Sequence, residues 1–425
     1  MLRHAKIRIV GTIAAIPLSA LWFATATSQT VTNDQTQAGN VFSSQTLDVV
    51  TASSDTTATT TSTGNSFTGS VVTGDLNVQS NQALSGNVQA QTVLNVAADA
   101  GPSTSLLTAA TGNTGTSVIS GGGTLSGNYI QNTTSPAAPN CLSLGGPCAP
   151  IDGESQIEGP NATTADLNMS VQAISNSQTF GTSDSALNVT ATQTNGSSVA
   201  ANGGAILGDV TDQGSFSSVG AGNNVTSTTS GVVSQTLGVT QTNDGAVTQG
   251  TEFVNLGNSE VTSTSATATG NNVSATNTGG PLDVSTNQDN ESYVRAQGVE
   301  TSFAFGGANV SAYGVGNSVM AGNVGPSTVL NNVQVNGTGG VQSIASFSGD
   351  NGFDAFVSST AIGNAATGFA CSSCGGVMSV TNSQTNNGDA SATASVALTS
   401  GARSVRSTAT AVGNSGTFYV SSPGN

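Results

Sequence analysis

The chain has 425 residues, of which 54 are glycine and only 7% are charged. Its 22 Asp and Glu against six Lys and Arg give a formal charge of −16, which repels phosphate backbones and anionic lipid surfaces. Nucleic-acid binding and peripheral binding to anionic membranes are therefore disfavoured.

The N-terminus has the organisation of a secretory signal peptide. Basic residues within 3–8 precede an apolar run over 9–23, which closes on the small residues 24–26. This order predicts export and cleavage after residue 26. The alternative, a membrane anchor, needs about 20 uninterrupted apolar residues, whereas Pro17 and Ser19 break this run. The exported remainder keeps three arginines and no His or Lys, so its formal charge is −19.

Gly-Asn pairs recur along the chain and set its period. In the C-terminal half they follow one another at intervals of 46 to 50 residues, and a Gln in a Val/Thr/Asn-rich pattern follows each of the first four after 18 to 21 residues. Two markers in one phase predict β repeats over 27–132 and 161–425 with a period of about 48 residues. The pairs are Gly64-Asn65, Gly112-Asn113, Gly222-Asn223, Gly270-Asn271, Gly316-Asn317, Gly363-Asn364 and Gly413-Asn414.

The repeats predict an all-β fold, a β-solenoid or parallel β-helix. Apolar and small polar residues alternate in segments such as 405–412, which favours strands with one inward face. Extra Gly-Asn pairs at Gly39 and Gly86 indicate a half-period near 24, so each repeat is expected to form two coils. Some 16 coils spaced by about 4.8 Å would make a rod near ~80 Å long.

The Gly-Asn pairs are expected to be structural turns, because glycine supplies the positive φ that a corner or hairpin needs. Identical Asn or Gln residues stacked coil over coil can also form ladders of side-chain amides. The alternative is that the pairs mark flexible loops of a Ser/Thr-rich stalk.

Residues 133–160 interrupt the period and are predicted to form an inserted surface loop that contains Pro, Cys141 and Cys148. In an oxidising compartment, two close cysteine pairs predict two local disulfides, Cys141 with Cys148 and Cys371 with Cys374. Pairing across the two sets is also compatible with the sequence. A redox Cys-x-x-Cys or a four-cysteine zinc site is less favoured, since neither a cation near the thiols nor the usual zinc spacing is evident.

No catalytic, cofactor-binding or metal site is expected. Catalysis most often recruits a His or another base, and the exported chain has neither His nor Lys. Glycosidases use two acids, but the acids here are scattered; Asp350 and Asp354 come closest to a cluster, and no aromatic sugar platform is evident beside them. The same segment matches no calcium-binding motif. We therefore expect that the chain is not an enzyme.

The segments 361–376, 384–386 and 410–414 resemble the holdfast attachment proteins of stalked alphaproteobacteria, specifically the D component (HfaD). The resemblance implies an extracellular protein, associated with the cell surface or outer membrane at the cell pole or stalk tip, that fixes an adhesive polysaccharide, the holdfast, to the envelope. It implies three kinds of partner: the holdfast polysaccharide, other holdfast anchor proteins, and a secretion pore lipoprotein of the curli type.

Such an anchor would work by multivalent contact along a stacked face and by self-association through exposed strand edges. Two alternatives from other classes fit the same repeats. One is an amyloid fibre subunit of the curli type, and the other is a secreted polysaccharide-degrading β-helix.

Overall fold

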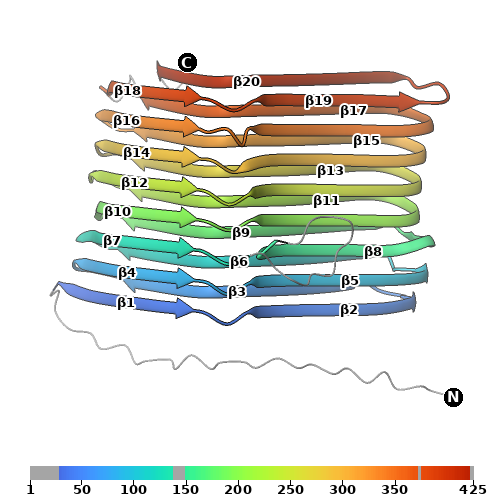
Figure 1. Ribbon diagram of the computed structural model, residues 1–425, viewed down its shortest axis with the longest axis horizontal. Helices are drawn as coiled ribbons and strands as arrows, with labels where there is room; N and C mark the ends of the chain where they lie inside the picture. The colour runs from blue at the N-terminus through green and yellow to red at the C-terminus, as the bar shows by residue number, and fades with distance from the viewer. Residues whose placement is uncertain (1–27, 137–148, 372–374, 422–425) are drawn as a thin grey trace.

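The computed structural model describes residues 28–136, 149–371 and 375–421, and every regular element in these ranges is a β-strand. The strands pair in parallel with strands of the following coil, so the expected β-solenoid is confirmed (Figure 1). No helix in the described ranges is long and apolar enough to cross a membrane. The predicted signal peptide, residues 1–26, lies outside them.

Each coil begins with a strand of an eight-stranded sheet. These strands are β1 (Gln29–Gln37), β4 (Leu76–Leu84), β7 (Thr124–Thr133), β10 (Ala186–Asn195), β12 (Gln235–Asn243), β14 (Leu282–Asn290), β16 (Ser327–Asn336) and β18 (Val377–Asn386).

A short connection leads from each of these strands into the second sheet. Its front strands in the first three coils and the last are β2 (Val41–Thr51), β5 (Val88–Asp99), β8 (Ile151–Thr164) and β19 (Ala390–Leu398). The strands that return behind them are β3 (Thr56–Val71), β6 (Ser103–Ser120), β9 (Asp166–Ser183) and β20 (Ser404–Ser421). In the four coils between, one long strand bends round from front to back: β11 (Val199–Ser230), β13 (Val247–Thr278), β15 (Tyr293–Val324) and β17 (Val341–Cys371).

One coil takes up a whole repeat, so the prediction of two coils in each repeat is wrong. Gln29 pairs with Leu76, 47 residues later, and Asn223 pairs with Asn271, 48 residues later. The described strands therefore form eight coils, which span about 38 Å at the spacing of paired strands instead of ~80 Å. The half-period arises because Gly-Asn pairs occur at two places in one coil: Gly39 and Gly86 lie between the two front strands, whereas the main series lies in the back layer.

The main Gly-Asn pairs are not turns, which corrects a second expectation. All seven lie inside strands, and none of their glycines has a positive φ. A Cβ at Gly222 would lie 2.6 Å from the Gly270 carbonyl oxygen and 2.7 Å from Asn243 Oδ1. Glycine is needed there for close approach within the interior, while positive φ occurs at other glycines such as Gly231 and Gly279.

The interior between the layers holds three hydrophobic clusters, and a polar stripe separates one of them from the other two. Along β6, Leu106 and Ala110 belong to a cluster on one side of the stripe, Asn113 lies in the stripe, and Ile119 belongs to the cluster on the other side. The clusters arise from the alternation of inward apolar and outward polar residues along each strand. The stripe therefore crosses the middle of the core, where buried amides need partners inside the protein.

The predicted insert, residues 133–160, contributes more to the solenoid than expected. β8 begins at Ile151 and pairs with β5 and β11, so the last ten residues of that range belong to the third coil. Residues 137–148, with Cys141 and Cys148, lie outside the described ranges.

Candidate functional site

A ladder of glutamine amides runs through the polar stripe along the solenoid axis. Each Nε2 donates to the Oε1 of the glutamine one coil earlier at 2.7 to 2.9 Å. Its second proton goes to a backbone carbonyl of the opposite layer, as from Gln241 to Asn272 O at 2.9 Å. The members are Gln35, Gln82, Gln131, Gln193, Gln241, Gln288, Gln334 and Gln384.

A second ladder is built by the asparagines of the Gly-Asn pairs, with Asn176 completing the series. Each Nδ2 donates to the Oδ1 of the asparagine one coil later at 2.8 to 2.9 Å, so this ladder runs in the opposite direction to the glutamine ladder. The same nitrogen reaches across to the other layer, as from Asn223 to Thr242 O at 2.8 Å. The sequence predicted such ladders, and the structure brings these side chains together.

Sequence reasoning missed a third ladder at the end of the front strands. Asn195, Asn243, Asn290, Asn336 and Asn386 link successive coils at 2.7 to 2.8 Å. The signal was present, because each of these asparagines follows a ladder glutamine by two residues. Buried and fully bonded amides fix the register, since a slip of one residue would leave them unpaired.

The two ends of the stack are open among the described residues, and they are complementary. At the first coil, Gln35 donates to Ser66 O, which leaves one amide proton without a described partner, while Asn65 Oδ1 accepts no bond. At the last coil, Gln384 Oε1 accepts no bond, and Asn414 Nδ2 only approaches Gln384 O at 3.4 Å. One end therefore offers the donors and acceptors that the other end needs.

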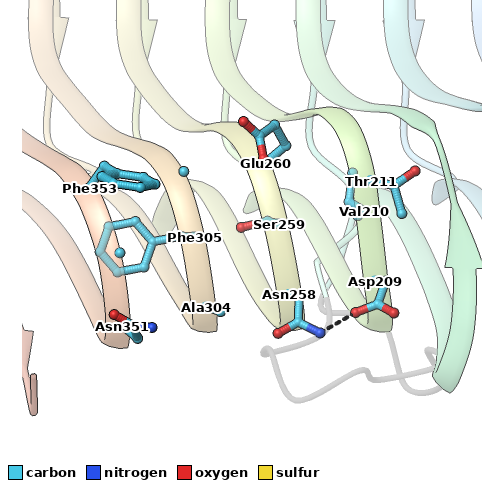
Figure 2. A pocket seen from close by; sticks show the side chains of 12 residues that line it. Asp209, Val210, Thr211, Asn258, Ser259, Glu260, Ala304, Phe305, Asn351 and Phe353 are labelled. Atoms are coloured by element: carbon cyan, nitrogen blue, oxygen red, sulfur yellow. Dashed lines mark hydrogen bonds between the residues drawn. The ribbon is translucent and has the colours of Figure 1, made fainter.

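A groove, here called the outer groove, crosses the outer face of β11, β13, β15 and β17 and continues round their bend. It consists of three adjoining hollows of about 350, 480 and 540 Å³. The first two share Ile206, Asn255 and Thr301. Figure 2 shows the third, where Phe353 and Phe305 lie at one end and Asp209, hydrogen-bonded to Asn258, at the other.

Asp350 and Asp354, the acids considered for hydrolysis, are held by different partners. Asp354 forms an ion pair with Arg403, whereas Asp350 accepts hydrogen bonds from Thr399 and Ser400. The hydrogen bonds from Thr399 and Ser400 hold the pKa of the Asp350 carboxyl below its usual range. The hydrogen bond and the charge of the Arg403 guanidinium do the same for Asp354. In the described ranges no three His, Cys, Asp or Glu side chains gather in a way that could hold a metal ion.

An aromatic ring lies near one of these acids, although the sequence did not indicate it. Phe303 and Asp350 line the same hollow, although they lie on neighbouring coils and are 47 positions apart. Only the register between β15 and β17 reveals this proximity.

Four carboxyls, those of Asp152, Glu154, Glu252 and Glu300, are buried in or against the second sheet. Burial raises the pKa of Glu252 to about 8, although a hydrogen bond from Ser218 Oγ acts to lower it. Burial also raises the pKa of Glu300 to about 7 and, together with the charge of Glu154, that of Asp152 to about 8. Gly203 leaves the space that the Glu252 carboxyl occupies. None of the four lines the outer groove, so their burial bears on the stability of the fold and not on that site.

Cys371 ends β17 and is buried, but its expected partner Cys374 lies outside the described ranges, as do Cys141 and Cys148. Both disulfides therefore remain predictions.

A comparison with protein families gives a match over most of the chain. A family model for holdfast attachment protein D (HfaD) matches residues 50–340, which is 291 of the 425 residues. The matched range includes the glutamine ladder from Gln82 to Gln334 and the groove residues on β11, β13 and β15. No curated protein and no solved structure matches the chain.

Proposed function

The chain belongs to the holdfast attachment protein D family, and from this premise we propose that it is a non-catalytic anchor that fixes an adhesive polysaccharide, the holdfast, to the cell envelope. The family has a role in holdfast attachment at the cell surface. Our proposal adds how the protein acts, which is by stacking end to end and by presenting the same binding face many times.

The observation that carries the proposal is the complementarity of the two open ends. If a second copy stacks its first coil on the last coil of this chain, Gln35 can donate to Gln384 Oε1 and Asn414 can donate to Asn65 Oδ1. Both bonds run in the direction that their ladders already have. Unpaired strand edges at both ends would gain backbone hydrogen bonds in the same step.

Stacking multiplies any weak contact with the polysaccharide. Each added copy repeats the same outer face along the axis, so one polymer chain can engage several sites at once. Linked sites bind far more tightly than single sites, by about 10²- to 10⁴-fold. An anchor built in this way needs only modest affinity per copy.

The partners and location that we propose follow from the family and from the predicted export signal. A secretion pore lipoprotein of the curli type would carry the chain across the outer membrane, and another holdfast anchor protein would contact one open end. The assembly would then sit at the cell pole or stalk tip.

A curli-like amyloid fibre subunit is the second candidate, and the same open ends favour it. The two functions differ in what the stack does: a fibre subunit forms the adhesive material, whereas an anchor connects a separate polysaccharide to the cell. The carboxyls of Asp350 and Asp354 are engaged by other side chains, which does not favour the polysaccharide-degrading enzyme.

Deleting the gene in the native bacterium tests the anchor. We expect deleted cells to shed intact adhesive polysaccharide onto the surface, and complementation with the full chain to restore its attachment to cells. Adhesive that stays on deleted cells with normal binding would contradict the anchor function. Loss of fibres, with the polysaccharide still attached, would favour the fibre subunit.

A further inference from the structure

We propose that the outer groove is the polysaccharide-binding face, and that its ligand is a glycan whose sugars carry free amino groups. This inference rests on the proposed function and names both the site and the ligand class. Shape, exposed aromatic rings and charge support it independently.

The shape of the groove suits an extended chain. The residues that line its three hollows come from the third coil, with β8, to the last coil, with Thr399, so an occupant would lie across the strands as well as along them. Gly204 opens the first hollow, because a Cβ there would have only Phe253 O within 4.0 Å. Gly204 aligns with Gln156 on one side and Phe253 on the other, which places a depression between a polar and an aromatic side chain.

Three phenyl rings project into the groove from successive coils. Phe253, Phe303 and Phe353 are 45%, 64% and 61% exposed, which is high for large apolar side chains in a soluble fold. In the register of these paired strands, each ring lies further toward the bend than the ring on the previous coil. The rings form a diagonal row, and such exposed apolar surface rimmed by polar groups marks a binding site. Flat rings offer a face to the C–H surface of a sugar.

Polar side chains around the rings supply hydrogen bonds. Asn202, Thr251, Asn255 and Thr301 line the first hollow and can donate to or accept from sugar hydroxyls. A few placed polar groups in a mainly apolar cleft are the usual arrangement of ligand sites.

Charge decides which glycan fits. Asp209, Glu260 and Asp350 line the groove, and among the described residues that line its three hollows there is no Lys, Arg or His. The guanidinium of Arg403 lies over the Phe353 ring, 5.7 Å from the ring centroid, and its charge is paired with Asp354. An anionic polysaccharide would be repelled, whereas ammonium groups would be attracted. The formal charge of −19 on the exported chain acts in the same direction.

Titration with matched sugars tests the proposal. The full exported chain is titrated by calorimetry with glucosamine oligomers and with N-acetylglucosamine oligomers of equal length, at low and high salt. We expect the glucosamine oligomers to bind at least tenfold more tightly at low salt, and this preference to shrink at high salt because ions screen the carboxylates. Equal affinity for both sugars, or no binding of either, would overturn the proposal.

Variants locate the site. Phe303→Ala with Phe353→Ala, and separately Asp209→Asn with Glu260→Gln, should each weaken glucosamine binding at least tenfold. Phe42→Ala with Asp34→Asn is the control, since these residues lie on β2 and β1, away from the groove. Circular dichroism checks that each variant keeps its fold. Groove variants that bind like the unchanged chain would refute the assignment.

The same variants separate this inference from the proposed function. They are expressed in the deleted strain, and attachment of the polysaccharide is scored. If deletion sheds the adhesive but the groove variants restore attachment fully, the anchor stands and the groove assignment fails. If deletion sheds nothing, the anchor itself fails, whatever the titrations give.

Discussion

Replacing Glu252 with Gln is expected to make the solenoid more stable at neutral and alkaline pH. The carboxyl is fully buried in β13, and burial raises its pKa from 4.5 to about 8. Above pH 4.5 the unfolded chain loses this proton while the folded chain keeps it. The folded state then binds more protons, so the free energy of unfolding falls as pH rises, up to about pH 8.

The magnitude follows from the two pKa values. At ~1.4 kcal/mol per pH unit, the fall between pH 5 and pH 8 is about 4 kcal/mol. Glutamine has nearly the same shape and no proton to lose, and its Oε1 can still accept the bond from Ser218 Oγ. The variant should therefore keep its stability over this range, apart from what Glu300 and Asp152 contribute.

Urea unfolding at pH 5, 6, 7 and 8, followed by circular dichroism, measures this difference. The advantage of Glu252→Gln over the unchanged chain should grow steadily with pH. Glu260→Gln is the matched control, because its side chain is exposed on the same strand, and it should give a constant difference. An advantage for Glu252→Gln that is the same at pH 5 and pH 8 would refute the reasoning.

Three further predictions concern the ladders and their ends. Gln241→Leu should lower the free energy of unfolding by about 2–4 kcal/mol in urea titrations, because it leaves a buried acceptor on one neighbouring coil and a buried donor on the other. Asn414→Lys should reduce the size of assemblies in sedimentation velocity, while Thr417→Lys, which faces outward on the same strand, should not; equal effects would exclude stacking through this end. Gly222→Ala should destabilise the chain by about 1–3 kcal/mol through overpacking, whereas Gly307→Ala, where a Cβ meets nothing within 4 Å, should unfold at nearly the same urea concentration as the unchanged chain.

The sequence predicted the fold class well, because each coil repeats the same markers. The period of these markers can be read even when the structural role of each marker is misinterpreted. Coil length was harder. Gly-Asn is a strong turn signal in isolation, yet here glycine serves close packing and asparagine serves a ladder, as at Gly222 and Asn223. Composition cannot separate these two uses. Only the packing of the pair against the facing layer of the solenoid shows which use applies.

The candidate site was less accessible to sequence reasoning. Phe253, Phe303 and Phe353 are spaced by about one repeat, but they come together only through a register that shifts from coil to coil. No short motif contains them. Glu252 could have been found, since it occupies an inward position in the alternation of its strand, where a carboxyl is out of place.

The stacking of the coils also determines how the molecule bears a mechanical load. When tension acts along the axis, every hydrogen bond between two neighbouring coils is stretched together, and the buried amide ladders share the force with the backbone. The coils cannot separate by breaking one bond at a time unless an end is peeled. A tether that is pulled across its whole end face is therefore much stronger than one that is pulled at a single corner.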